Sequence, residues 1–387
     1  MDKLYRTHKI RLYPTYEQEI YFKKACGIKR FTYNWALNEW NKEYEKYIKN
    51  KKSCKAPNHR ILRDRFTKLK NNKKELSFIN EVSKYAFSNA FEDLGNSFKR
   101  LFNKQGKYPK FKSKKRSKDS FREDAATKFS IKVKDYSLFI PKWQKNPIKL
   151  AECLRYPNGK IKSCTISRTA DMWFASILVE LLESPKDELK RYNKTKDKIG
   201  IDLGIKTFAT LSNGKKIKIK NKMKRRLKRL DKKVNILQNI LSRKSKRSNN
   251  REKVKTKLSR TYYKIKCIKE DFLHKKSQHL VRKYNNICME DLTLKNMMKN
   301  HKLAKSLQES MFRTFITYMD YKSKRKHNVI LILADSKYPS TQLCSGCNNR
   351  KTGKDKLKLK NREYICTKCG LIIDRDLNAS INLEKLI

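Results

Sequence analysis

The chain has 387 residues, with 98 Lys and Arg against 37 Asp and Glu, and a formal net charge of +61. This excess is far larger than solubility requires, so we expect a polyanionic partner held by salt-sensitive contacts to phosphates. A membrane is not expected as the partner, because the chain contains no run of about 18 apolar residues. The first residues also lack the pattern of a secretory signal.

The ten cysteines do not predict a disulfide framework. Four of them form two tight pairs. The other six are scattered without a pattern: Cys26, Cys54, Cys153, Cys164, Cys267 and Cys288. Such usage is typical of a reducing compartment, so we expect the scattered cysteines to be ordinary core or surface thiols.

The first half of the chain predicts a small β domain into which helices are inserted. Residues 5–13 alternate between polar and apolar side chains, as a strand does, and stop at Pro14. A helical period runs from residue 15 to about residue 101, and strand-like segments lie between about residues 128 and 182. We therefore expect a β domain made of residues 1–14 and 126–190, with a helical lobe over residues 15–125.

A long basic helix is expected in the second half. Residues 221–260 hold 17 Lys and Arg against two acids, and apolar residues recur there at helical spacing. A solvated face is the simpler interpretation of most charge runs, but this imbalance favours contact with phosphates. The helix is predicted to continue through residues 272–284.

Around this helix, strands alternate with helices. Residues 198–204 and 286–290 are apolar segments of strand length, and the strand at 209–211 turns at Asn213-Gly214, a strong hairpin signal. Apolar positions between residues 303 and 318 predict another helix, and residues 328–334 a further strand. This alternation predicts an α/β layer with a partly parallel sheet.

Two Cys-x-x-Cys pairs predict a structural zinc ion. Cys344 and Cys347 are separated from Cys366 and Cys369 by 18 residues, a spacing at which four thiolates close a tetrahedral site. Gly346 and Gly370 lie where the knuckles are expected to need a permissive backbone. Two redox dithiols are the alternative, but two such pairs at this spacing favour one zinc ribbon over residues 340–371.

Acidic residues are expected at the ends of three buried strands in this basic chain. Asp202 and Glu290 each end one, and Asp374 and Asp376 follow residues 370–373. A buried carboxylate is costly unless a metal or cation compensates it. Taken singly, these acids could cap a turn, pair with a lysine or form a local cluster that caps the last helix. Together they predict a site for two Mg²⁺ or Mn²⁺ ions of the kind that promotes phosphodiester cleavage.

These motifs closely resemble those of TnpB, the transposon-encoded, RNA-guided DNA endonucleases of the OrfB type. The family is related to the compact type V CRISPR nucleases and to Fanzor of eukaryotes and giant viruses. The resemblance rests on segments along nearly the whole chain: residues 8–15 and 27–37, 108–113, 199–204, 271–275, 289–292, 339–345 and 374–379. The order of the acidic motifs, with the ribbon between the second and third, is highly specific.

The resemblance implies an α+β multidomain fold. A small wedge-like β-barrel domain with an inserted helical recognition lobe would precede a RuvC-like nuclease domain of RNase H fold, residues 195–387, with the zinc ribbon inserted. Asp202, Glu290 and Asp376 would be the catalytic carboxylates and would bind the two Mg²⁺ or Mn²⁺ ions. Asp376 is preferred over Asp374 because the family pattern is Asp-x-Asn-Ala-Ala, from which Ser380 departs.

The resemblance also implies the partners. A guide RNA made from the transposon end would pair with one strand of a double-stranded DNA target, beside a short motif read by the protein. One nuclease site would cut both strands in succession. Lys84, Tyr85 and Asn89 are candidates for reading that motif, although an ordinary polar helix face explains them equally well. Further candidate nucleic-acid contacts are Lys110, Lys112, Lys224, Arg225 and Lys228.

Two rival functions remain at this point. A non-cleaving, zinc-containing regulator that binds DNA or RNA would explain the charge and the ribbon, but in it the three acids would have only a structural role. A transposase that joins DNA ends is disfavoured by the order Asp, Glu, Asp. We expect a cytoplasmic, nucleoid-associated protein if the host is a prokaryote, and a nuclear or viral-factory protein otherwise. The oligomeric state is not predicted.

Overall fold

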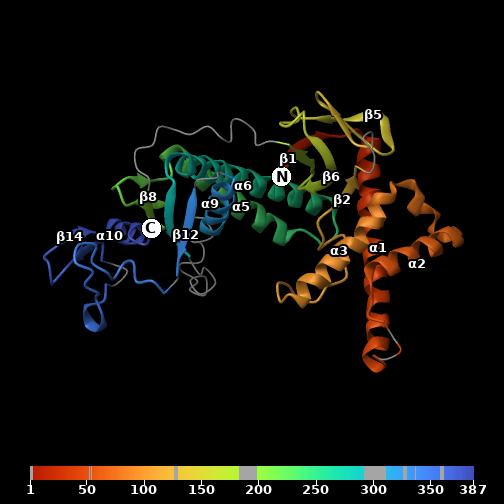
Figure 1. Ribbon diagram of the computed structural model, residues 1–387. Helices are drawn as coiled ribbons and strands as arrows, with labels where there is room; N and C mark the ends of the chain where they lie inside the picture. The colour runs from red at the N-terminus through yellow and green to blue at the C-terminus, as the bar shows by residue number, and fades with distance from the viewer. Residues whose placement is uncertain are drawn as a thin grey trace. The chain divides into compact units, whose positions relative to one another are not determined.

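The computed structural model describes residues 3–51, 53, 55–125, 130–182, 198–291, 311–325, 329–335, 337–357 and 361–387 (Figure 1). The chain divides into two compact units, Met1–Ser184 and Pro185–Ile387. Within the described ranges, none of the helices combines the length and apolar character needed to cross a membrane.

The first unit is built on a seven-stranded sheet in the order β2-β6-β7-β1-β5-β4-β3, with antiparallel pairs throughout. Its strands are β1 (Leu4–Tyr13), β2 (Ser120–Asp124), β3 (Lys132–Lys134), β4 (Ser137–Ile140), β5 (Trp143–Leu150), β6 (Lys160–Thr169) and β7 (Met172–Leu181). Strand β1 buries every second side chain, as the alternation over residues 5–13 predicts.

This sheet differs from the expected barrel in two respects. Among the described residues, the edge strands β2 and β3 do not pair, so the sheet is open. Residues 15–125 were expected to be helical, but they include the strand β2. Its side chains Phe121 and Glu123 are buried in alternation, and Phe121 pairs with Ile166 of β6. Five residues of mixed polarity are too short a signal to separate a strand from the end of a helical lobe.

The helices of the first unit are α1 (Tyr16–Lys49), α2 (His59–Asn72) and α3 (Lys84–Phe102), with a 3₁₀ helix, η1 (Lys74–Glu81), before α3. Helix α1 begins at a capping box in which Thr15 and Gln18 accept each other's backbone N–H groups. It packs on the sheet through aromatic contacts: the ring centroid of Phe22 lies 5.0 Å from Trp173 of β7 and 5.8 Å from Phe121 of β2.

The second unit holds a five-stranded sheet in the order β10-β9-β8-β11-β12. Strands β8, β11 and β12 run parallel, whereas β9 and β10 are antiparallel, which confirms the partly parallel sheet. The strands are β8 (Lys198–Leu203), β9 (Ala209–Leu211), β10 (Lys216–Ile217), β11 (Asn286–Glu290) and β12 (Ile330–Ala334). The helices are α5 (Asn221–Arg243), α6 (Asn249–Lys283), α9 (Phe312–Lys324) and α10 (Arg375–Glu384), with a short 3₁₀ helix, η2 (Gly353–Asp355). A separate hairpin pairs β13 (Glu363–Ile365) with β14 (Ile372–Asp374).

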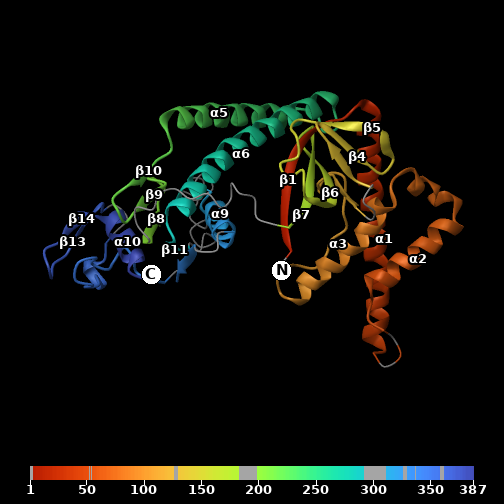
Figure 2. The same cartoon turned by 45° about the horizontal axis from the view of Figure 1, so that its top comes forward.

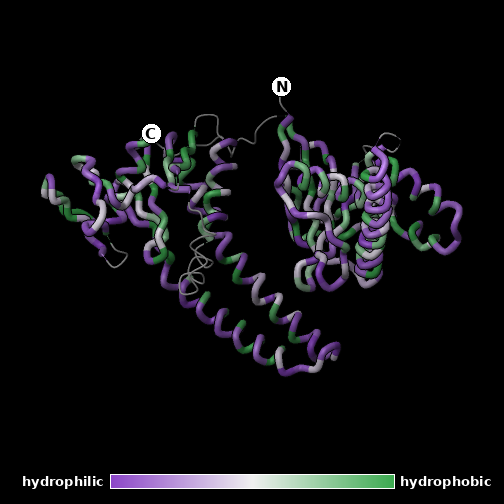
Figure 3. The backbone as a smooth tube through the Cα atoms, turned by 90° about the horizontal axis from the view of Figure 1, so that it is seen from below, coloured by the Kyte–Doolittle hydropathy of each residue, from purple (hydrophilic) through white to green (hydrophobic). Residues whose placement is uncertain are grey.

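The single long helix predicted over residues 221–260 is instead a hairpin of two helices (Figure 2). Helix α5 ends at Arg243, and α6 begins after Ser248, whose side chain accepts the N–H of Arg251. Val234 and Leu237 of α5 pack against Leu258 and Ile265 of α6. Both helices carry the same mixed hydropathy (Figure 3), so the period of the pattern does not reveal the break between them.

Other predicted boundaries also shift. Helix α9 begins at Phe312, after Met311 with a φ of 53°, a left-handed conformation that interrupts a helix. The expected helical positions 303 and 307 lie outside the described residues, as does residue 328 at the start of the expected last strand.

Candidate active site and zinc ribbon

The central strands of the second unit are covered on both faces. Ile199 and Ile201 of β8 pack with Met289 of β11 in an apolar core that also includes residues of α6 and α9. Since side chains alternate along a strand, Gly200 and Asp202 point to the opposite face. On that face, Cys288 of β11 packs against Leu383 of α10.

Gly200 allows α10 to lie directly on β8. A Cβ atom at this position would stand 1.9 Å from the carbonyl oxygen of Ser380 and 2.5 Å from the backbone nitrogen of Glu384. Any residue other than glycine would therefore push the helix away from the strand. The helix lies close to β8 and β9 in Figure 2, which brings its residues onto the face that carries Asp202.

Asp202 and Glu290 are brought together by the parallel pairing of β8 with β11. Ile201 and Met289 are partners in the register, so Glu290 follows one residue later beside Asp202, on the same face. Neighbouring strands lie roughly 4.8 Å apart. Asp202 is 7% exposed.

Asp376, the third candidate carboxylate, lies on helix α10 and not on a strand of the sheet. The strand β14 ends at Asp374, and it pairs with β13 instead of extending the five-stranded sheet. Asp374 caps α10: its Oδ1 accepts the N–H groups of Asp376 and Leu377, each at 3.0 Å. Asp376 therefore lies in the first turn of α10, which corrects the expectation that it ends a strand. Its Oδ2 is 4.0 Å from where a Cβ at Gly204 would be, next to the end of β8.

The electrostatics agree with a gathering of these three carboxylates. Burial and, to a smaller extent, the charges of Asp376 and Glu290 raise the pKa of Asp202 to about 8, against the opposing charge of Arg375. Burial also raises the pKa of Glu290. Arg375 Nη2 pairs with Asp376 Oδ1 at 3.2 Å. Asp202 and Glu290 thus resist ionisation by themselves, and their hard oxygen donors are suited to divalent cations.

The three carboxylates lie farther apart than the ligands of a single compact metal site. Of the described His, Cys, Asp and Glu side chains, the four cysteines are the only group of three or more whose ligand atoms all lie within 4.8 Å of one another. The oxygens of Asp202, Glu290 and Asp376 therefore do not converge on a single point. Two cations about 3.5–4 Å apart need a wider arrangement of donors than one cation does.

The four predicted zinc ligands come together as expected. The sulfur atoms of Cys344 and Cys369 lie 3.6 Å apart, as do those of Cys347 and Cys366. In a tetrahedral site with Zn–S bonds of about 2.3 Å, sulfur atoms are separated by about 3.8 Å. The cluster thus fits one zinc ion with four protein ligands, which leaves no position for a substrate.

The two knuckles use different residues for the left-handed turn. Gly370 has a φ of 72°, as predicted, but the equivalent residue of the first knuckle is Asn348, with a φ of 58°. Gly346 was expected to need the permissive backbone, and it is not in the left-handed region; a Cβ there would make ordinary contacts, the nearest at 3.5 Å from Leu371. Asparagine tolerates the left-handed conformation better than most residues, so it can take the place of glycine at this turn.

Two buried asparagines of α10 hold the first knuckle. Asn378 accepts the N–H of Ser345 at 2.8 Å and donates to the carbonyl oxygen of Leu343 at 2.6 Å. Asn382, one turn later, donates to the carbonyl oxygens of Ser340 and Leu343, both at 2.8 Å. In the sequence, Asn378 stands out only as part of the motif at residues 374–379, and no pattern marks Asn382. The ribbon is therefore joined through side chains to the helix that carries Asp376.

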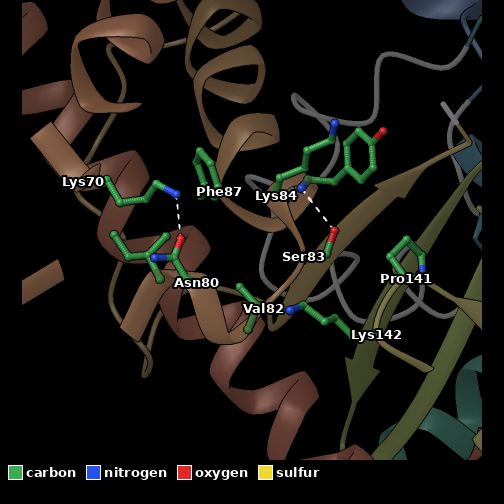
Figure 4. Close-up of a pocket in the computed structure, with 10 residues that line it drawn as sticks. Lys70, Asn80, Val82, Ser83, Lys84, Phe87, Pro141 and Lys142 are labelled. Carbon is green, nitrogen blue, oxygen red and sulfur yellow. Dashed lines mark hydrogen bonds between the residues drawn. The ribbon is translucent and has the colours of Figure 1, made fainter. Parts of the chain in front are cut away.

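The candidates for reading a DNA motif lie at the start of α3 in the first unit. Lys84 and Tyr85 line a pocket of about 320 Å³, together with Lys70 of α2 and Lys142 before β5 (Figure 4). Asn89 faces elsewhere: it is buried, and it exchanges hydrogen bonds with the backbone oxygen and guanidinium of Arg122 at 3.0 and 2.6 Å. The structure thus gives Asn89 a partner within the fold.

The remaining basic candidates differ in exposure. Lys110 is exposed, as are the candidates on α5, Lys224, Arg225 and Lys228. Lys112 is half-buried, with its Nζ 3.4 Å from the ring centroid of Tyr33, and burial lowers its pKa to about 8. Its backbone is fixed by Asn34, which accepts its N–H at 2.7 Å and donates to its carbonyl oxygen at 2.9 Å.

Three family models match the chain. Residues 176–301 match OrfB_IS605, described as "Probable transposase", and residues 312–383 match the "Cas12f1-like, TNB domain". Residues 1–49 match HTH_OrfB_IS605, described as "Helix-turn-helix domain". In this chain that last segment forms the strand β1 and the single 34-residue helix α1, so its description does not correspond to its structure here.

Relatives cover both units. A protein of Streptomyces pristinaespiralis named "Putative RNA-guided DNA endonuclease" is 32% identical over 385 residues, 99% of this chain and 89% of its own length. A second of that name, InsQ of Escherichia coli (strain K12), is 26% identical over 77% of this chain and 69% of its own length.

Among solved structures, the Cas12f1-sgRNA-target DNA complex contains a chain with the same fold. The match has a TM-score of 0.61 and 14% identity, and it covers 99% of each chain. The 32% identical relative and the OrfB models identify this chain as a member of the TnpB family.

Proposed function

We propose that the protein is an RNA-guided, metal-dependent DNA endonuclease encoded by a transposable element, which cuts DNA beside a short recognised motif. The observation that supports this most is the meeting of Asp202, Glu290 and Asp376 on one face of the second unit's sheet. A regulator without nuclease activity has no use for three partly buried acids at one place, which are costly to keep. The names of the two relatives agree with the proposal.

In the proposed site, Asp202, Glu290 and Asp376 hold two Mg²⁺ or Mn²⁺ ions. Bound cations of this kind supply activation of a water and charge stabilisation of the leaving oxygen. The protein's own contribution is to keep the donors in place on β8, β11 and α10 and to exclude solvent from Asp202. We assign this unit a RuvC-like RNase H fold, which the order of its strands supports.

The proposed partners are a guide RNA from the transposon end and a double-stranded DNA target. A formal charge of +61 suits a protein that holds a heteroduplex by its backbone, without reading its sequence. The exposed basic residues of α5 are proposed phosphate contacts. The first unit is proposed as the wedge-like domain and recognition lobe, with Lys84 and Tyr85 at the pocket of Figure 4 reading the adjacent motif.

The proposal is tested by purifying the protein expressed with its native flanking DNA. RNA that co-purifies is sequenced, and a plasmid library matching it is incubated with the complex and Mg²⁺. We expect cleavage beside one enriched motif by the wild type, and none by Asp202→Ala. A matched control is Asp320→Ala, which removes an exposed acid of α9 that pairs locally with Lys324. Absence of RNA contradicts the guided function; bound RNA and DNA without any cleavage supports the regulator instead.

A further inference from the structure

Asp374 is an acid beside the proposed site that the three catalytic assignments leave unused. Its two oxygens have separate partners. Oδ1 accepts the N–H groups of Asp376 and Leu377 at the start of α10, each at 3.0 Å. Oδ2 accepts a hydrogen bond from the ammonium group of Lys216, with Nζ 2.8 Å away. One carboxylate thus connects the first turn of α10 to the strand β10.

Lys216 stands in the same cross-strand row as Asp202. Lys216 of β10 is the register partner of Thr210 of β9, and Thr210 is the partner of Asp202 of β8. Directly opposed residues of antiparallel strands place their side chains on the same face of the sheet. The lysine therefore extends from the row that carries Asp202, on the face over which α10 lies.

Helix α10 has a second attachment farther along its length. At Gly200 its backbone meets β8 near Ser380, and this contact fixes the middle of the helix against the strand. It does not fix the first turn, where Asp376 is. That turn is held by the Asp374 cap and, through the same side chain, by Lys216, while Asn378 just after it is bonded to the first zinc knuckle.

The Lys216–Asp374 ion pair is too exposed to be important for the global stability of the protein. The side chains of Lys216 and Asp374 are 36% and 39% exposed. Ion pairs this accessible to solvent contribute little to global stability. Their effect here is local, because the pair joins a two-residue strand to the first turn of a helix.

We propose that Asp374 and Lys216 are positioning residues of the nuclease site: together they hold the first turn of α10 so that Asp376 faces Asp202. This inference rests on the proposed endonuclease function. Asp374 directs the turn through its backbone amides, and Lys216 ties Asp374 to the strand row of Asp202. Neither residue needs to contact the DNA or the cations.

The cap is tested without reference to activity. Asp374→Ala removes both bonds, whereas Asp374→Asn keeps an oxygen that can accept the two amides, since asparagine and aspartate cap helices about equally well. Hydrogen exchange over residues 372–384 is expected to be roughly fivefold faster at the first turn in Asp374→Ala, and close to wild type in Asp374→Asn. Unchanged exchange in Asp374→Ala would overturn the capping role.

The role of the Lys216–Asp374 ion pair, which links α10 to the sheet, is tested by the metal dependence of cleavage. Asp374→Asn and Lys216→Met each break the ion pair, and each is expected to raise the Mn²⁺ concentration for half-maximal cleavage several-fold, with a near-normal rate at saturating Mn²⁺. The double variant is expected to be no worse than either single one, because both remove the same interaction. Lys215→Met removes an exposed positive charge from the neighbouring position and is expected to match wild type.

Three results would contradict the positioning role of the Lys216–Asp374 ion pair. The Lys216→Met and Lys215→Met curves could coincide, the two single effects could add in the double variant, or Asp374→Asn could abolish cleavage at every Mn²⁺ concentration. The last result would make Asp374 a direct ligand. If the wild type cuts no DNA at all, the proposed function fails, and Mn²⁺ binding measured by calorimetry on the same variants still decides the positioning inference.

Discussion

Replacing Gly200 by alanine tests the close packing on which the proposed site depends. The added Cβ would lie 1.9 Å from the carbonyl oxygen of Ser380 and 2.5 Å from the backbone nitrogen of Glu384. Both are backbone atoms of α10, so no side chain can rotate to relieve the contact. Because ordinary contacts begin near 3.4 Å, the helix has to withdraw by about 1.5 Å.

A shift of this size has two expected consequences. Overpacking of a core typically costs about 1–3 kcal/mol, which chemical denaturation of the apo protein will measure. Misplacement of a catalytic group by about 1 Å can lower a rate roughly 100-fold, so cleavage of a guide-matched plasmid is expected to fall at least this much. The loss in rate is therefore larger than the loss of folded protein explains.

The matched control is Gly27→Ala. Gly27 lies within α1, and a Cβ there would meet no atom within 4 Å. Alanine favours a helix over glycine by about 1 kcal/mol, so this variant should be as stable as the wild type or more so, and fully active. If Gly200→Ala unfolds at the same denaturant concentration as the wild type and cuts at the same rate, the geometry inferred for α10 on β8 is wrong.

Three further predictions follow from the described contacts. Because folding raises the pKa of Asp202 from 3.8 to about 8, the folded metal-free protein binds more protons than the unfolded chain between these values, so its stability falls as pH rises through this window. Denaturation midpoints from pH 5 to 8 should show the fall, and Asp202→Asn should remove most of it. Asn382→Ala leaves the carbonyl oxygen of Ser340 without its buried donor and removes one of the two donors to that of Leu343, so it should cost about 1–3 kcal/mol in the same assay; a change below about 0.5 kcal/mol contradicts the linkage. Cys366→Ser should lower zinc content, folding yield and cleavage together; a zinc-free variant that folds and cuts normally contradicts the structural site.

Much of the second unit could be predicted from the sequence, because its strands are short apolar segments with clear ends. Asp202 and Glu290 each close such a segment, and parallel strands bring their carboxyl ends to the same edge of a sheet. The Cys-x-x-Cys spacing likewise favoured one cluster of the four sulfur atoms over two separate dithiols, and the structure confirms the cluster. These features depend on local pattern alone.

The details that sequence analysis missed depend on contacts distant in the chain. A cap on the last helix was one of the alternatives for Asp374, but residues 370–376 alone do not separate it from a strand that ends with Asp374 and Asp376. The partner of its second oxygen, Lys216, lies 158 residues away. Asn348 in the left-handed turn and Asn382 on α10 are also ordinary polar residues until the ribbon is folded.

The most direct test of the central claim compares two plasmids that differ only in the segment complementary to the co-purified RNA. The wild-type complex with Mg²⁺ is predicted to cut the matched plasmid and leave the unmatched one intact, while Asp376→Asn cuts neither despite binding the same RNA. Equal cutting of both plasmids would contradict guidance by RNA, and undiminished cutting by Asp376→Asn would contradict the site formed by Asp202, Glu290 and Asp376.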